Sequence, residues 1–261
     1  MTTSYDNPAH LGPRGTVVVL PGRGEGAAVY ERLGARLAAD AYRVRITADP
    51  ALDPAGVAAE VKAVLGDEED APRPHVLLGS DAGALFAALL LAEGAVAADG
   101  AVLAGLPVGD RGEGHGGERG GDRVGEPVDG RTADWESELD ARTACPAHRA
   151  RLSDGTALHR GSLRTAPPPD WAERAAPEDV VVPVLGLRGA DDPLTGADAS
   201  RDWFSRLPDG ELVGIAGTAH DVLNDRTHRT AAALVVRFLE RLRLGPGLPE
   251  AETTEVPRGA R

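Results

Sequence analysis

The sequence of 261 residues contains very little lysine and few aromatic side chains. Lys62 is the only lysine, so all other members of the 28 basic residues are arginine. Aromatic residues make up 3% of the chain, and a buried core must therefore be built mainly from Ala, Val and Leu. The bias toward Arg, Ala, Gly and Pro is typical of high-GC codon usage, and we infer no chemistry from it.

Other absences exclude several partners and locations. Cys145 is the single cysteine, so no intrachain disulfide forms, which fits a reducing cytoplasm. We find no run of 18 apolar residues that could cross a bilayer, and residues 1–14 lack the apolar segment of a signal peptide. The net charge of −13 disfavours nucleic-acid phosphates and anionic membranes as partners. We expect a cytoplasmic protein that binds a small-molecule substrate.

Short apolar strands alternate with helical segments along most of the chain. The expected strands are 16–20, 42–48, 75–78, 101–106, 180–187 and 211–216. The expected helices are 27–40, 54–65, 81–93, 197–207 and 221–244. This alternation predicts an α/β protein with a mostly parallel sheet of about six strands and helices on both faces.

The alternation is interrupted over residues 107–177. Nine of the 22 residues at 109–130 are glycine, mixed with charged residues, which predicts a flexible segment. A weakly helical stretch follows at 134–163. We interpret 107–177 as a cap inserted over the carboxyl ends of the strands, where open parallel sheets bind ligands. The remaining predicted parts are the core at 15–106 and 178–244, a disordered lead at 1–14 and a disordered tail at 245–261.

The most informative motif is Gly-Ser-Asp-Ala-Gly at 79–83, between an expected strand and an expected helix. A nucleophile elbow has glycine two residues before and two residues after the nucleophile, because the turn leaves no room for side chains there. This spacing selects Asp81, with Ser80 as the alternative nucleophile. A plain helix cap would also explain an aspartate at this position.

An acidic pair and a histidine follow two later strands. Asp191 and Asp192 come after the strand at 180–187, and His220 comes after the strand at 211–216. The order of nucleophile, acid and histidine, each at a strand end, is the order of the α/β-hydrolase catalytic triad. We therefore take Asp81, an acid of this pair and His220 as candidate catalytic residues.

Three stretches resemble the α/β-hydrolase fold family, in particular its monoacylglycerol-lipase and lysophospholipase branch. They are Leu-Pro-Gly-Arg-Gly-Glu at 20–25 with Tyr30, the elbow at 79–83, and Gly-Thr-Ala-His-Asp-Val-Leu-Asn-Asp at 217–225. The resemblance implies an α/β-hydrolase fold, Asp192 as triad acid with Asp191 as runner-up, and an oxyanion hole from the backbone N–H groups of Arg23 and Ala82. The chain departs from this branch at Pro21, where the branch has His, and at Asp81, where lipases have Ser.

Aspartate nucleophiles occur in the related epoxide hydrolases and haloalkane dehalogenases. There the carboxylate attacks an sp³ carbon, and a histidine activates the water that hydrolyses the resulting ester. An aspartate that attacked an ester carbonyl would form a mixed anhydride, which is a poorer route. The elbow therefore favours hydrolysis at an alkyl carbon, with an epoxide or halide leaving group. No metal or cofactor is implied.

The expected cap carries further polar and aromatic candidates. Trp135 and Trp171 could bind a halide, although packing is the commoner role of tryptophan. His148 could act as an acid near neutral pH. It belongs to a polar cluster that we interpret as a solvent-exposed helix turn, made of Arg142, Cys145, His148 and Arg149.

Three other functions stay open at this point. The first is a carboxylesterase or lysophospholipase-like ester hydrolase. The second is a non-catalytic relative that binds a ligand in a disabled site, which the replacements at Pro21 and Asp81 favour. The third is a nucleotide-binding protein, since Gly-Arg-Gly-Glu-Gly-Ala at 22–27 and Asp49 fit a Rossmann pattern.

Overall fold

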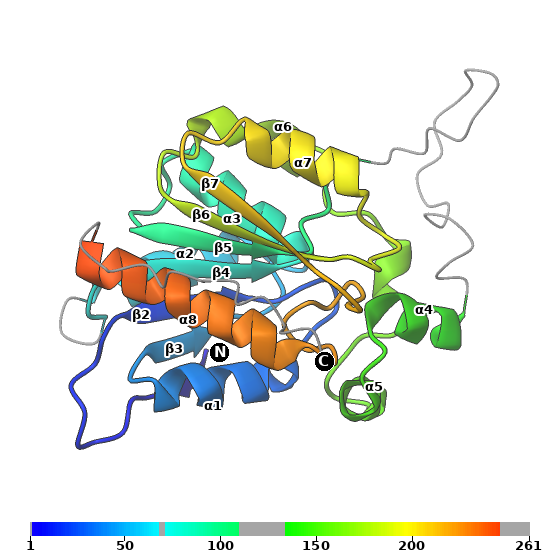
Figure 1. The fold of residues 1–261 in the computed structure, drawn as a ribbon, viewed down its shortest axis with the longest axis horizontal. Coiled ribbons are helices and arrows are strands. Elements are labelled where there is room, and N and C mark those ends of the chain that lie inside the picture. Colours follow the sequence, from blue (N-terminus) through cyan, green and yellow to red (C-terminus); the bar gives the residue numbers. More distant parts are fainter. Residues whose placement is uncertain (1, 68–70, 110–133, 246–261) are drawn as a thin grey trace, which may run out of the picture.

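The computed structural model of this chain describes residues 2–67, 71–109 and 134–245. Its centre is a seven-stranded sheet with the order β1-β3-β2-β4-β5-β6-β7 (Figure 1). Six neighbouring strands are parallel, which confirms the predicted α/β class. These six strands are β2 (Thr16–Leu20), β3 (Arg43–Ile46), β4 (His75–Ser80), β5 (Gly100–Ala104), β6 (Val184–Gly189) and β7 (Gly210–Ile215).

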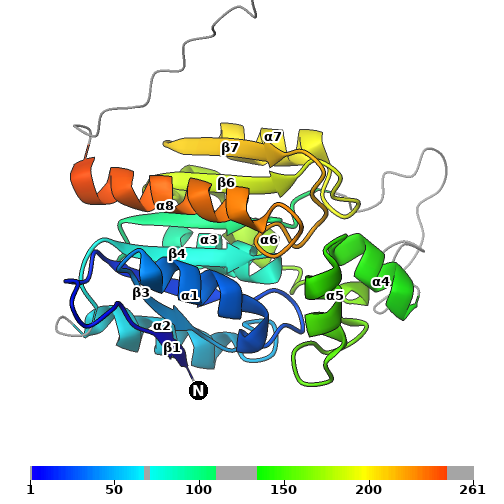
Figure 2. The same ribbon diagram turned by 60° about the horizontal axis from the view of Figure 1, so that its bottom comes forward.

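Helices cover both faces of the sheet because successive strand side chains point to opposite faces. Val17 and Val19 of β2 pack in one apolar cluster with α1 (Glu31–Ala39) and α8 (His228–Leu244). Val18 and Leu20 pack in a second cluster with α2 (Pro54–Gly66), α3 (Ala82–Ala92) and α7 (Ala197–Ser205). Figures 1 and 2 show α1 and α8 side by side on the same face.

The strand order excludes one of the sequence-based alternatives. A Rossmann sheet has the order 3-2-1-4-5-6. Here the first two parallel strands in the chain, β2 and β3, lie at one side, and the later strands follow from β4 to β7 across the sheet. The sheet therefore does not have the Rossmann order on which the nucleotide-binding interpretation of residues 22–27 depended.

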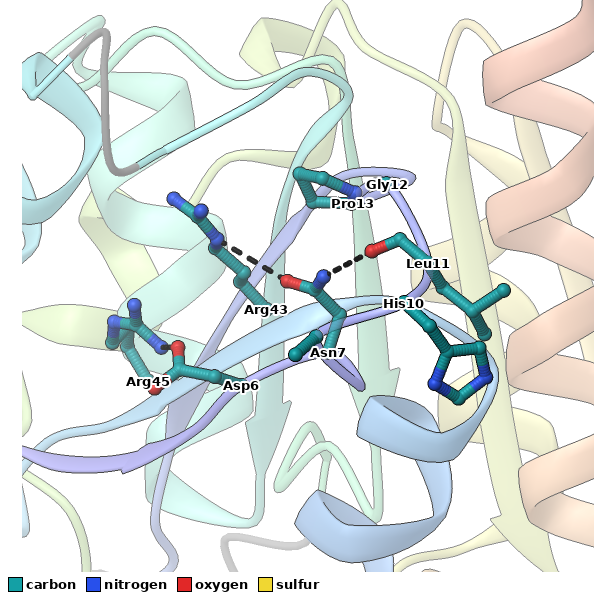
Figure 3. Close-up of a pocket in the computed structure, with 9 residues that line it drawn as sticks. Asp6, Asn7, His10, Leu11, Gly12, Pro13, Arg43 and Arg45 are labelled. Atoms are coloured by element: carbon teal, nitrogen blue, oxygen red, sulfur yellow. Dashed lines mark hydrogen bonds and ion pairs between the residues drawn. The ribbon is translucent and has the colours of Figure 1, made fainter.

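The amino-terminal segment corrects another prediction. We expected residues 1–14 to be a disordered lead, but β1 (Thr3–Tyr5) pairs antiparallel with β3 at the sheet edge. Asp6 then binds Arg45, and Asn7 bonds to Arg43 and to the carbonyl of Leu11, beside a hollow of about 640 Å³ (Figure 3). Hydrogen bonds to a strand edge and to β3 arginines order a segment that is too polar to signal a strand.

The insert after β5 is described at residues 107–109 and again from residue 134, where it consists of separate short helices. The glycine-rich segment, from 110 onward, and the tail after Gly245 both lie outside the described residues. The described part of the insert contains α4 (Trp135–Arg142), α5 (Pro146–Ser153), η3 (Ser162–Arg164), α6 (Trp171–Arg174) and η4 (Pro177–Asp179). Figures 1 and 2 show α4 and α5 together at one end of the sheet.

The last helix begins later than its sequence pattern predicts. We expected a helix from Asp221, whereas α8 begins at His228. The carboxylate of Asp225 accepts hydrogen bonds from the backbone N–H groups of Ala144, Ala219 and Arg226, which hold residues 221–227 in turns. No helix among the described residues is long and apolar enough to cross a membrane.

Candidate functional site

Asp81 occupies a sharp turn between β4 and α3. Its backbone has φ of 49° and ψ of −122°, a region that costs a non-glycine residue roughly 1–3 kcal/mol. Neighbouring backbone stabilises the turn, because Asp81 N–H donates to the Ala104 carbonyl at 2.9 Å and the Asp81 carbonyl accepts from Ala84 N–H at 2.9 Å. The side chain is held at the carboxyl edge of the sheet and is 3% exposed.

The two glycines of the motif lie against other backbone atoms. A Cβ atom on Gly83 would be 2.1 Å from the carbonyl oxygen of Leu20, and one on Gly79 would be 2.4 Å from the Cα of Ala84. Neither contact is relieved by a rotamer change, since both neighbouring atoms belong to backbone. Glycine is therefore required at both positions for β2, β4 and α3 to approach as closely as they do.

Replacing Gly83 with alanine should destabilise the protein by roughly 3 kcal/mol, because the added methyl group cannot fit without moving β2 or α3. Gly66 at the end of α2 is the matched control, since a Cβ there meets nothing within 4 Å. Gly66→Ala should change the free energy of unfolding by less than about 1 kcal/mol. Urea denaturation of the two variants measures the difference, and equal stabilities would contradict the close-packed turn.

His220 lies between two carboxylates. Its Nδ1 is 2.9 Å from Asp192 Oδ2, and its Nε2 is 3.4 Å from Asp81 Oδ1. Asp192 is itself oriented by the backbone N–H groups of Leu194 and Thr195, which bond to Oδ1 at 2.8 and 3.2 Å. Within the described part of the chain, His220 Nε2 is buried and has no well-formed hydrogen bond. The ring is thus fixed on its Nδ1 side and points its Nε2 at Asp81.

Arg23 adds a cation to this group. Its Nε is 2.7 Å from Asp81 Oδ2 and its Nη2 is 2.7 Å from Asp81 Oδ1, a bidentate ion pair. Its backbone N–H also donates to Asp81 Oδ2 at 3.0 Å. The third nitrogen, Nη1, donates to the carbonyl of Thr165 in the insert at 2.6 Å. Arg23 therefore connects the Asp81 carboxylate to the insert.

These contacts fix the charges of the site. Burial alone would raise the pKa of Asp81, but Arg23 and His220 outweigh it and hold this pKa well below its usual range. Burial alone would lower the pKa of His220, but Asp192 and Asp81 raise it to about 10. At neutral pH Asp81 is consequently ionised and His220 is protonated. The site is a closed network of carboxylates and cations.

A second buried network holds the loop that carries Arg23. Arg142 of α4 donates from Nη2 to the Arg23 carbonyl at 3.0 Å and lies 3.2 Å from Glu25 Oε1. Glu25 Oε2 accepts the N–H of Gly22 at 2.9 Å and the hydroxyl of Tyr30. Burial and the Asp221 carboxylate raise the pKa of Glu25 to about 7. Through Arg142, the insert helix α4 thus fixes the loop that contains Arg23 and Glu25.

The structure separates the sequence-predicted candidates into two groups. It brings together Asp81, His220, Asp192 and the backbone of Arg23, and it places Ala82 directly after Asp81 at the first position of α3. Asp191 is exposed, so it is Asp192 that contacts His220. Ser80 is buried at the end of β4, and its hydroxyl bonds to Tyr30.

The insert candidates have other partners. Trp171 packs against Phe86 of α3 with ring centroids 4.7 Å apart, and Trp135 lies beneath the guanidinium of Arg160. His148 Nε2 is 2.9 Å from Asp221 Oδ2. Arg149 forms ion pairs with Glu136 and Asp140. The predicted solvent-exposed cluster is also corrected, because Arg142 is fully buried and His148 and Cys145 are nearly so.

The sequence prediction missed the side chain of Arg23, which it used only as a backbone donor. A signal was present, since a buried carboxylate at an elbow needs a cation partner and the preceding loop contains an arginine between two glycines. The described residues contain no group of three His, Cys, Asp or Glu side chains arranged to hold a metal ion. At the candidate site, the cationic side chains that could bind an anionic group are Arg23 and His220.

Comparisons with solved structures identify the fold. A monoacylglycerol lipase from Paleococcus ferrophilus superposes with a TM-score of 0.69 at 17% identity, over 93% of this chain and 98% of that one. A monoglyceride lipase from Saccharomyces cerevisiae has a TM-score of 0.69 at 15% identity, over 92% and 91% of the two chains. The chain has the α/β-hydrolase fold. An enol-lactonase from Burkholderia xenovorans shares this fold, with a TM-score of 0.59, 16% identity and coverage of 92% and 96%.

No protein-family model matches the sequence. No curated protein is significantly similar to it. The fold places Asp81 where the chain turns from β4 into α3, and places Asp192 and His220 after β6 and β7. The resemblance noted from three short motifs therefore extends to the architecture of most of the chain.

Proposed function

We propose that the protein is a hydrolase of a small organic molecule that uses Asp81 as a nucleophile toward carbon. The observation that carries this proposal is the position of the Asp81 carboxylate, with one oxygen on the Arg23 backbone N–H and the other facing His220 Nε2. The first oxygen is stabilised by the donor that later serves the oxyanion. The second oxygen is the one that attacks.

The proposed reaction has two steps. Asp81 Oδ1 forms a bond to an sp³ carbon and the leaving group departs with the electrons of its own bond, which gives an ester on Asp81. The ester is neutral, so Asp81 no longer adds to the raised pKa of His220, and only Asp192 still raises it. This loss favours release of the Nε2 proton to solvent before the second step. His220 Nε2 then accepts a proton from water as that water attacks the Asp81 carbonyl carbon, and Asp192 stabilises the imidazolium. The bond from this carbon to the product oxygen breaks, the product oxygen takes the second proton of the water and leaves as an alcohol, and the Asp81 carboxylate is restored.

Heavy-oxygen labelling tests this function directly. A single turnover of the enzyme in H₂¹⁸O should place the label in the Asp81 carboxylate, because the second step hydrolyses the ester at the Asp81 carbonyl. We expect this result with at least one member of a panel of haloalkanes, halocarboxylates and styrene-oxide-type epoxides. Mass spectrometry of the peptide that contains Asp81 is the measurement. Turnover with label only in the released product would contradict the nucleophile.

A second candidate function is ligand binding without turnover. The bidentate ion pair of Arg23 with Asp81 favours it, since a carboxylate that accepts two hydrogen bonds from a guanidinium is a weakened nucleophile. The same panel distinguishes the two functions, because a non-catalytic site would give neither product nor label. Ester hydrolysis is a third possibility, for which a chromogenic ester in the same panel is the probe.

Replacing Asp192 with asparagine should lower kcat by roughly 10²–10⁴-fold, because the amide no longer stabilises the imidazolium or fixes its tautomer. Asp191→Asn is the matched control one residue away, and it should leave kcat within about twofold because this side chain is exposed. Circular dichroism checks that both variants are folded. A strong effect of the Asp191 variant alone would reassign the acid.

A further inference from the structure

The buried Arg23 guanidinium needs a negatively charged partner, and the proposed reaction removes the one that it has. Arg23 is 8% exposed, and Asp81 is the only carboxylate among the described residues that hydrogen-bonds it. Asp49 also interacts with Arg23 electrostatically, but its oxygens accept the N–H groups of Gly24 and Ala51 at 2.6 and 2.8 Å. When Asp81 becomes a neutral ester, the buried guanidinium therefore loses its directly bonded counter-charge. A buried charge without such a partner is strongly unfavourable.

The same ion pair also restrains the attacking oxygen. Arg23 Nη2 donates to Asp81 Oδ1 at 2.7 Å, which lowers the reactivity of the lone pairs that must attack carbon. A substrate that brings its own anion to Arg23 removes both difficulties. It competes with Asp81 for the guanidinium before the first step, and it neutralises the guanidinium after Asp81 has lost its charge.

The hydrogen bonds of Arg23 suggest the edge at which such an anion would bind. The Nε and Nη2 side of Arg23 faces Asp81, whereas Nη1 donates to the Thr165 carbonyl at 2.6 Å. Thr165 is an exposed residue of the insert. An incoming carboxylate would replace this carbonyl oxygen on the Nη1 and Nη2 edge, in the bidentate arrangement that guanidinium favours. The atom next to that carboxylate would then lie beside Oδ1, since Nη2 contacts both.

We propose that Arg23 is a specificity-determining residue that selects substrates with a carboxylate on the reacting carbon, such as 2-haloalkanoates. This inference rests on the proposed function and names its substrate class. For 2-chloropropionate, Asp81 Oδ1 forms a bond to C2 and chloride leaves with the C–Cl electron pair. Water then hydrolyses the ester and gives one proton to His220 and the other to the lactate hydroxyl, which releases lactate and regenerates the Asp81 carboxylate.

Two substrates of nearly equal size test the inference on the wild-type enzyme. 2-Chloropropionate and 2-chloropropionamide have the same leaving group and the same carbon skeleton, and they differ in the charge next to the reacting carbon. Chloride release should give a kcat/KM at least about 10²-fold higher for the acid, because a site built for a polar partner rejects the analogue that lacks it. Arg23→Lys should reduce this ratio at least tenfold, mainly through the KM of the acid.

Arg201→Lys on α7 is the control for the arginine variant, because its exposed side chain pairs only with Asp198 among the described residues, and it should leave the ratio unchanged. Equal kcat/KM values for the acid and the amide would overturn the inference, as would turnover of neutral haloalkanes only, while ¹⁸O in Asp81 would still support the proposed function. Turnover of neither compound together with no label from the whole panel would overturn both. The wild-type ratio decides the question even if Arg23→Lys fails to fold.

Discussion

Replacing His220 with glutamine should stop the reaction after its first step and leave the substrate attached to Asp81. The carboxylate needs no base to attack carbon, since Arg23 remains in this variant and its bidentate ion pair keeps Asp81 ionised. The second step does need a base, because water must lose a proton as it attacks the ester. We expect turnover to fall by roughly 10²–10⁴-fold while the ester accumulates to one equivalent per chain.

Intact-mass measurement followed by peptide mapping would detect the ester on the peptide that contains Asp81. His10→Gln is the control, because His10 is an exposed histidine in the amino-terminal segment (Figure 3), and it should turn over at the wild-type rate without an adduct. His220→Gln with Asp81→Asn should give no adduct. Loss of turnover without any adduct in the single variant would instead indicate that His220 acts before or during the first step.

The candidate site illustrates which contacts a sequence predicts. The turn at Asp81 was predictable because its requirement is local, two glycines at fixed spacing around one residue. The meeting of Asp81 and His220 was predictable from strand order, because the carboxyl ends of parallel strands share one edge. The choice of Asp192 over Asp191 followed from family resemblance. The structure supplies a physical reason, because backbone N–H groups orient the Asp192 carboxylate.

Contacts between distant side chains were not predictable in this way. The ion pair of Arg23 with Asp81 joins residues 58 positions apart and depends on a rotamer that also reaches Thr165. The burial of Arg142 was equally unpredictable, since it depends on ion pairs with Glu25 and Asp221, which lie far away in the chain. Polar residues at such distances show no periodicity, so the sequence indicated a solvent-exposed turn where the structure has a buried network.

Removing Arg23 alone should destabilise the protein more than removing Arg23 and the Asp81 charge together. Arg23→Met leaves the Asp81 carboxylate buried without its guanidinium, and such a change typically costs about 3–5 kcal/mol. The double variant with Asp81→Asn removes both members of the ion pair and leaves His220 paired with Asp192, so it should recover at least about half of that loss. The difference between the single and double variants isolates the interaction between the two side chains.

Urea denaturation at pH 7 of the two single variants and the double variant gives this interaction free energy. Arg201→Met serves as the control, because the ion pair of Arg201 with Asp198 is exposed and should contribute less than about 1 kcal/mol. If the free-energy losses of the two single variants add up to that of the double variant, Arg23 and Asp81 act independently. The ion pair between them would then not be formed in solution. A strong interaction would support the premise of both proposals, because it would show that the Arg23 charge needs an anionic partner whenever Asp81 is neutralised.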